Sequence, residues 1–391
     1  MSRGRLTLGL TMLALTLAPA GAHAAVWELK TAVLPAGGTE GELLGVSCAS
    51  ASVCTAVGDY FNGSIVGAMG NEWNGTSWAV ASVEANPGEK NGKLYGVLCY
   101  SSTRCMAVGS YGTKGGGGNS LVEASNKGAW THVTSPNHGG GKFDKLYDVW
   151  CKSLEYCVAT GDYLNTEAGE KGAVLAEEWE GTTWNLMSPI ENPGKNKNGK
   201  LWSIACSAEA SCRAVGNWGT EAGIGVAGEE TLSGTKWSAT QLPEPPVADF
   251  AELYGISCTS EKSCMAVGVW RETESETKKL TILTELWNGK AWSYSIPPRP
   301  IGATESEFRS VSCPAVEECI AVGHYRDSSK KELTLAEVWN GKEWKIQTSP
   351  NPSGALASAL QGVSCTEIEV CNAVGDYLNS ENKLKPLAAH L

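Results

Sequence analysis

Fourteen cysteines arranged in seven pairs constrain this 391-residue chain more than any other feature. Five residues separate the two members of every pair, and successive pairs begin 51 to 55 residues apart. A zinc site needs four ligands and usually has two to four residues between paired thiolates, so the spacing disfavours metal. We therefore predict that each pair closes on itself as a disulfide within one structural repeat. The pairs are Cys48/Cys54, Cys99/Cys105, Cys151/Cys157, Cys206/Cys212, Cys258/Cys264, Cys313/Cys319 and Cys365/Cys371.

The sequence between the cysteine pairs predicts four short β-strands in each repeat. In the sixth repeat they are the runs 308–313, 319–325, 333–339 and 344–350, rich in β-branched and aromatic residues and without helical periodicity. Asn340-Gly341 separates the last two runs, and both residues tolerate the positive φ of a tight hairpin turn. Four antiparallel strands repeated at this interval are typical of a β-propeller blade.

The two ends of the chain complement each other. The last repeat stops at Leu391 after its third run, whereas Trp27–Pro35 matches the fourth run of the other repeats. We therefore predict an all-β, seven-bladed β-propeller over residues 25–391, with one intra-blade disulfide per blade. In this prediction the N-terminal strand completes the last blade and closes the ring, so no end blade is left exposed.

Residues 1–24 have the features of a secretory signal peptide: Arg3 and Arg5, an apolar run from Leu6 to Ala20, and small residues at the end. Without this segment the chain has 29 basic and 42 acidic residues, a net charge of −13. That charge argues against nucleic acid as a partner, and no other apolar run is long enough to span a membrane. We expect a secreted, extracellular monomer.

Two short patterns resemble known propeller repeats. The hairpin Trp-Asn-Gly-x-x-Trp is similar to part of a kelch blade, and Gly75-Thr-Ser-Trp78 resembles the end of the Asp-box hairpin of sialidase-type propellers. Over the whole chain after residue 24, the Ser-Cys…Cys-x-Ala-Val-Gly repeats resemble those of exported actinobacterial proteins. This resemblance implies an exported propeller and no particular activity.

Residues that differ between repeats are the better candidates for function, because scaffold positions recur. Long connections between strands two and three, and between four and one, should share one face of a propeller, and function concentrates on such loops. Arg271, Arg299, Arg309 and Arg326 fall on or beside this long-loop face in the fifth and sixth repeats. With His324 they are candidates for clasping a carboxylate or sulfate group. The alternative is a solvated rim of mixed charge, since acidic residues lie among them.

An aromatic residue ends the second strand of every repeat, including Trp218, Trp270 and Tyr325. These residues are candidates for a ring of stacking platforms for a ligand, or alternatively for packing between blades. In the first, third and seventh repeats this aromatic residue follows an aspartate: Asp59, Asp162 and Asp376. The three aspartates are candidates for Ca²⁺ ligands at the channel mouth, or for turn caps. No other cofactor or metal is expected.

No nucleophile motif, zinc motif or phosphate loop is present in the sequence. It therefore favours a non-catalytic protein that binds an extracellular polysaccharide or protein on the long-loop face. Two alternatives remain open. One is a secreted glycoside hydrolase or polysaccharide lyase that acts on an acidic sugar, and the other is a structural protein of a cell-surface or spore layer.

Overall fold

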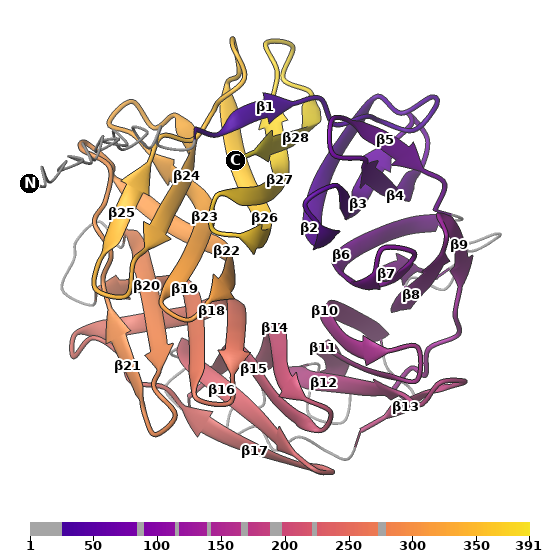
Figure 1. The fold of residues 1–391 in the computed structure, drawn as a ribbon, viewed down its shortest axis with the longest axis horizontal. Helices are drawn as coiled ribbons and strands as arrows, with labels where there is room; N and C mark the ends of the chain where they lie inside the picture. The colour runs from indigo at the N-terminus through magenta and orange to yellow at the C-terminus, as the bar shows by residue number, and fades with distance from the viewer. Residues whose placement is uncertain are drawn as a thin grey trace, which may run out of the picture.

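Seven four-stranded antiparallel units surround a central axis (Figure 1). The computed structural model describes residues 26–83, 90–113, 117–138, 142–165, 171–187, 198–220, 225–272 and 279–391. Within these ranges the regular secondary structure is entirely β, with 28 strands. The all-β prediction with four strands per unit is therefore confirmed. The predicted signal peptide lies outside the described residues.

Each unit runs outward from a strand next to the axis. The first has β2 (Glu40–Ser50), β3 (Val53–Phe61), β4 (Val66–Trp73) and β5 (Trp78–Ala81). The second has β6 (Lys90–Ser101), β7 (Arg104–Gly112), β8 (Gly118–Asn126) and β9 (Ala129–His132). The third has β10 (Lys142–Ser153), β11 (Tyr156–Asn165), β12 (Lys171–Trp179) and β13 (Trp184–Leu186). The fourth has β14 (Gly199–Ala208), β15 (Ser211–Gly219), β16 (Gly225–Ser233) and β17 (Lys236–Gln241).

The remaining three units follow the same order. The fifth has β18 (Ala248–Ser260), β19 (Ser263–Glu272), β20 (Leu280–Trp287) and β21 (Trp292–Ser295). The sixth has β22 (Glu305–Ala315), β23 (Glu318–Arg326), β24 (Glu332–Trp339) and β25 (Trp344–Gln347). The seventh has β26 (Ala357–Glu367), β27 (Val370–Leu378) and β28 (Leu384–His390). One difference from seven separate sheets is a single parallel bridge between Gly225 and Phe250, which joins the fourth and fifth units into one eight-stranded sheet.

The fourth strand of the seventh unit comes from the other end of the chain. β1 (Glu28–Lys30) pairs antiparallel with β28, with Glu28 opposite His390 and Lys30 opposite Ala388 (Figure 1). Trp27, which precedes β1, is 4% exposed and donates its indole N–H to Gln347 in the sixth unit at 3.0 Å. The predicted pairing of the two chain ends is therefore present.

Hydrophobic side chains fill the space between neighbouring units, because both faces of a unit are apolar. The described residues form seven such clusters, each with members from two adjacent units. One of them packs Leu43 and Met69 of the first unit against Val374 and Ala388 of the seventh. Apolar side chains are thus buried between units, and this burial stabilises the fold.

All seven predicted disulfides are formed, each between the first and second strands of its unit. They join Cys48 to Cys54, Cys99 to Cys105, Cys151 to Cys157, Cys206 to Cys212, Cys258 to Cys264, Cys313 to Cys319 and Cys365 to Cys371. The second cysteine of every pair is buried. The bridges are therefore part of the packed interior of the molecule.

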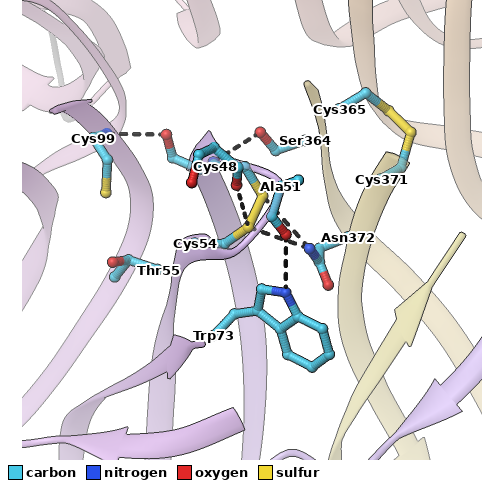
Figure 2. Close-up of a disulfide and its surroundings, with 12 residues drawn as sticks. Cys48, Ala51, Cys54, Thr55, Trp73, Cys99, Ser364, Cys365, Cys371 and Asn372 are labelled. Atoms are coloured by element: carbon cyan, nitrogen blue, oxygen red, sulfur yellow. Dashed lines mark hydrogen bonds between the residues drawn. A yellow bond between two sulfur atoms is a disulfide. The ribbon is translucent and has the colours of Figure 1, made fainter. Parts of the chain in front are cut away.

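The serine before the first cysteine has a role that the sequence did not reveal. In the four units that have this serine, the first, fifth, sixth and seventh, its hydroxyl accepts the backbone N–H of the corresponding cysteine in the next unit, as from Cys99 to Ser47 at 2.9 Å. The same bond runs from Cys48 to Ser364, between the first and last units, at 3.0 Å (Figure 2). The Ser-Cys motif therefore links units as well as strands.

A glycine in the second strand of every unit, preceded by Ala-Val in six units and by Ala159-Thr160 in the third, allows that strand to approach a bulge in the first. In all seven units a Cβ at this glycine would lie 1.8–2.0 Å from a backbone oxygen of the first strand. In the third unit the glycine is Gly161 and the oxygen belongs to Lys145. Because that neighbour is backbone, no side-chain movement can relieve the overlap.

We expect Gly161→Ala to lower the free energy of unfolding by about 3 kcal/mol, since it forces two paired strands apart. Gly172→Ala in the neighbouring strand is the matched control. Its Cβ would meet nothing closer than 3.7 Å, so its effect should stay within about 1 kcal/mol. Denaturant titration of both variants with intact disulfides makes the comparison, and equal stabilities would contradict the close-approach argument.

The observed pairing of β1 with β28 is one part of the prediction that the N-terminal strand closes the ring. The other part, that this strand stabilises the whole ring, can be tested by deletion. Deleting residues 26–35 removes Trp27 from its buried position and leaves the seventh unit one strand short. We expect a loss of more than about 4 kcal/mol of unfolding free energy, compared with about 0.5 kcal/mol for Glu28→Ala at an exposed position. A deletion variant as stable as the full chain in denaturant titration would contradict closure of the ring by this strand.

Candidate functional site

A cavity of about 600 Å³ lies where the fifth, sixth and seventh units meet. Its walls come from the ends of the strands that lead into or out of the long connections, including β18, β19, β22, β23 and β26. The polar lining residues are Tyr254, Arg271, Glu305, Ser306, Glu307, Arg309, His324, Arg326, Glu332, Gln361 and Asp376. The structure thus brings together three of the four predicted arginines and the predicted histidine.

The centre of the cavity wall is a cluster of Arg309, Glu307 and His324. Arg309 donates to Glu307 at 2.5 Å, and Nε2 of His324 lies 3.0 Å from the same carboxylate oxygen. Burial raises the pKa of Glu307, although the guanidinium of Arg309 opposes that rise. Burial, together with the nearby guanidinium groups, lowers the pKa of His324 to about 4, against the opposing effect of Glu332. His324 is therefore neutral at pH 7 and adds no positive charge.

The other two arginines of the cavity are also paired. Arg326 lies 3.0 Å from Glu305 and 3.4 Å from Glu332. Arg271 lies 2.8 Å from Asp249, and its guanidinium is 5.4 Å from the ring centre of Phe250.

The balance of charge around these arginines is acidic. The three guanidinium groups lie among five carboxyl groups, because Asp376 also lines the cavity. Burial raises the pKa of Asp376 to about 6, while a hydrogen bond from Gln361 at 3.0 Å opposes the rise. The site is an array of fixed donors and acceptors rather than a positively charged clasp.

The other predicted site residues lie elsewhere. Arg299 is exposed and does not line the cavity. Trp218, 2% exposed, occupies the space left by the missing side chain of Gly228, and Trp270, 9% exposed, belongs to the cluster between the fourth and fifth units. Tyr325 packs partly buried against the cluster between the fifth and sixth units. These three aromatic residues pack against other parts of the protein, as the alternative interpretation predicted. None of them lines the cavity.

The predicted disulfide cysteines take no part in the cavity and belong to the scaffold. Cys54, Cys157 and Cys371 are at most 1% exposed, and Cys105 is 7% exposed. Each of the four packs into a hydrophobic cluster between units, and none of them lines the cavity. Their sulfur atoms are therefore closed off from a ligand, and their role is structural.

The three aspartates predicted as Ca²⁺ ligands or turn caps have polar partners within the protein. Asp59 lies 3.1 Å from Lys93 of the next unit, and burial raises its pKa to about 6. Asp162 accepts a hydrogen bond from Tyr147, and Asp376 accepts one from Gln361. Across the described ranges no three metal-ligating side chains come together.

Sequence reasoning missed an arc of aromatic residues on the strands next to the axis. Tyr95, Tyr147, Trp202 and Tyr254 occupy one register position on β6, β10, β14 and β18, where each is the extra, unpaired residue of a bulge. Successive ring centres are 5.3, 4.3 and 5.8 Å apart. Arg309 continues the arc on β22, with its guanidinium 4.5 Å from the ring centre of Tyr254. Aligning the first strands of the repeats would have revealed this position.

Five repeated glutamates are buried and do not line the cavity. They occupy one position on the third strand of the second to sixth units, and each is 0% exposed. They are Glu123, Glu177, Glu230, Glu285 and Glu337. Burial raises the pKa of Glu285 to about 9, with Glu244 adding to the effect, and burial alone raises the pKa of Glu337 to about 8. Both are protonated in the folded protein at pH 7.

Comparison with known proteins supports the fold only. No family model matches the chain, so the kelch and Asp-box similarities remain resemblances, and no curated protein matches it. A GH74 xyloglucanase from Xanthomonas campestris superposes with a TM-score of 0.54 at 12% identity, covering 92% of this chain and 55% of the xyloglucanase. A protein of unknown function from Dyadobacter fermentans superposes with a TM-score of 0.52 at 9% identity, covering 79% of this chain and 96% of the other.

Within the part of the chain that the structure describes, no helix has the length and apolarity of a membrane span. The seven disulfides indicate an oxidising environment.

The buried glutamates predict that stability falls as the pH rises. Above the ordinary glutamate pKa of 4.5 the unfolded chain releases these protons, whereas the folded protein keeps them up to about pH 8 or 9. We expect wild-type Tm to decrease through this window and to level off above it. The double variant Glu285→Gln/Glu337→Gln should show a weaker decrease and a higher Tm at pH 8, but no advantage at pH 4. Calorimetry across the pH range tests this, and identical profiles would contradict it.

Proposed function

We propose that the chain is a non-catalytic binding protein for an extracellular carbohydrate, and that the cavity between the fifth, sixth and seventh units is its binding site. The observation that supports this is the pairing of every cavity arginine with a carboxylate. Sugar hydroxyls both donate and accept hydrogen bonds, so a wall of alternating, immobilised donors and acceptors suits them. Phe250 and Tyr254 add aromatic surface for the C–H face of a sugar ring.

The same pairing favours a neutral ligand over an acidic one. A sulfate or uronate would have to displace a carboxylate from each guanidinium and then lie among five carboxyl groups. Repulsion between like charges in a partly buried site makes that exchange costly. The cavity therefore supports polysaccharide recognition more than hydrolysis or lysis of an acidic sugar.

We further propose that the protein is exported by cleavage after residue 24 and that its ring is closed by β1. The disulfides suit an oxidising compartment, and the pairing of β1 with β28 suits closure.

A glycoside hydrolase is the second candidate, because two carboxyl groups with raised pKa, Glu307 and Asp376, line one cavity. Such groups can act as general acids near neutral pH. If the protein hydrolyses a neutral polysaccharide, Asp376→Asn should abolish the release of reducing ends.

The binding experiment uses calorimetric titration with neutral cello-, xylo- and manno-oligosaccharides and with acidic oligogalacturonate. We expect binding to at least one neutral series and none to oligogalacturonate. Arg271→Met and Arg326→Met should each weaken binding about tenfold or more, the effect of losing a charged hydrogen bond of about 1.5–3 kcal/mol. Arg104→Met, beside a cysteine on the opposite face, is the matched control and should bind like wild type. Binding only to the acidic ligand, or to none, would refute the proposal.

A further inference from the structure

We infer that the aromatic arc of Tyr95, Tyr147, Trp202 and Tyr254 forms a subsite for the terminal ring of a glycan chain whose next residues lie in the long-loop cavity. This inference rests on the proposed function and adds to it the part of the chain that is recognised. The four aromatic residues line a channel space of about 120 Å³. This space is separate from the long-loop cavity.

Contacts with neighbouring side chains hold Trp202 and Tyr254 of the arc in place. Trp202 donates its indole N–H to Glu252 at 2.6 Å, and the hydroxyl of Tyr254 donates to the same carboxylate at 2.9 Å. The ammonium group of Lys200 lies 5.0 Å from the ring centre of Trp202. Side chains fixed in this way lose little conformational entropy when a ligand stacks on them. An aromatic surface prepared in advance suits the apolar C–H face of a sugar.

The channel space adjoins the long-loop cavity. Tyr254 and Gln361 line both of them, and Arg309, whose guanidinium contacts Tyr254, lies on the cavity side. A ligand held by the paired arginines therefore has direct access to the end of the arc at Tyr254. The arc then extends through Trp202 and Tyr147 to Tyr95 on the far side of the axis.

The surroundings of the channel favour a chain end over the middle of a chain. Residues from all seven inner strands line the space, so the strands surround it around the axis. The inner strands come close together at the residue after the arc, where a Cβ at Gly96 would lie 2.6 Å from the backbone oxygen of Tyr147. An internal sugar would need a second chain segment that leaves the space, either past this close approach or back through the cavity. A terminal sugar needs only the segment that enters from the cavity.

The test compares one neutral series, cello-oligosaccharides or whichever of the neutral series binds, with the long polymer of the same sugar. Calorimetric titrations use equal masses of oligosaccharide and polymer. The number of protein molecules bound should be proportional to the number of chain ends in each sample. Trp202→Leu should weaken oligosaccharide binding about tenfold and leave the residual binding independent of chain ends. Trp202→Phe keeps an aromatic ring and should bind within about threefold of wild type, which separates stacking from misfolding. Tyr294→Leu, at an exposed position on β21, is the control for surface substitution.

The outcomes distinguish the two proposals. Binding that follows total mass rather than chain ends, or a Trp202→Leu variant that binds like wild type, overturns the subsite and leaves the cavity proposal intact. A wild-type protein that binds no neutral oligosaccharide overturns the cavity proposal and the subsite with it. End-dependent binding that Trp202→Leu abolishes and Trp202→Phe retains supports the subsite.

Discussion

The packing of each four-stranded unit against its neighbours is the interaction on which the rest of the structure depends. A single unit has two apolar faces and cannot bury both by itself, so each hydrophobic cluster takes residues from two units. In four of the seven units the Ser-Cys motif adds a polar contact at the same interface, because the serine hydroxyl of one unit accepts a backbone N–H of the next. The disulfide then joins the strand that carries this serine to the second strand of its unit. One short motif therefore stabilises both the unit and its contact with the next unit.

This repeated framework explains where functional differences can accumulate. The positions that pack between units recur, and a change there disturbs a cluster that two units share. Positions at the strand ends near the long connections face a cavity instead, and there the units differ: Glu307 and Arg309 in the sixth unit correspond to Ala359 and Gln361 in the seventh. A nearly symmetric scaffold therefore presents an asymmetric site at the junction of three units.

Some of the site could be predicted from the sequence, and the reasons for success and failure are physical. Arg271, Arg309, Arg326 and His324 were found because they are rare residue types on strands whose ends the repeat pattern places on one face. Their pairing with carboxylates was not predictable, since Asp249 and Glu305 are close in space only through strand pairing. Trp218 and Tyr163 share a repeat position, yet Trp218 is buried because Gly228 on the adjacent strand leaves room for it.

By itself the sequence determined the number of units, the four strands in each, the disulfide pairing and the complementary chain ends. All of these follow from local patterns that the chain repeats at a constant interval. Only the tertiary structure decided which side chains from different units meet. The aromatic arc joins residues 52 to 55 positions apart on four different units, and its contacts depend on how closely the inner strands approach the axis. That approach depends on side-chain volumes and strand bulges, which no local pattern specifies.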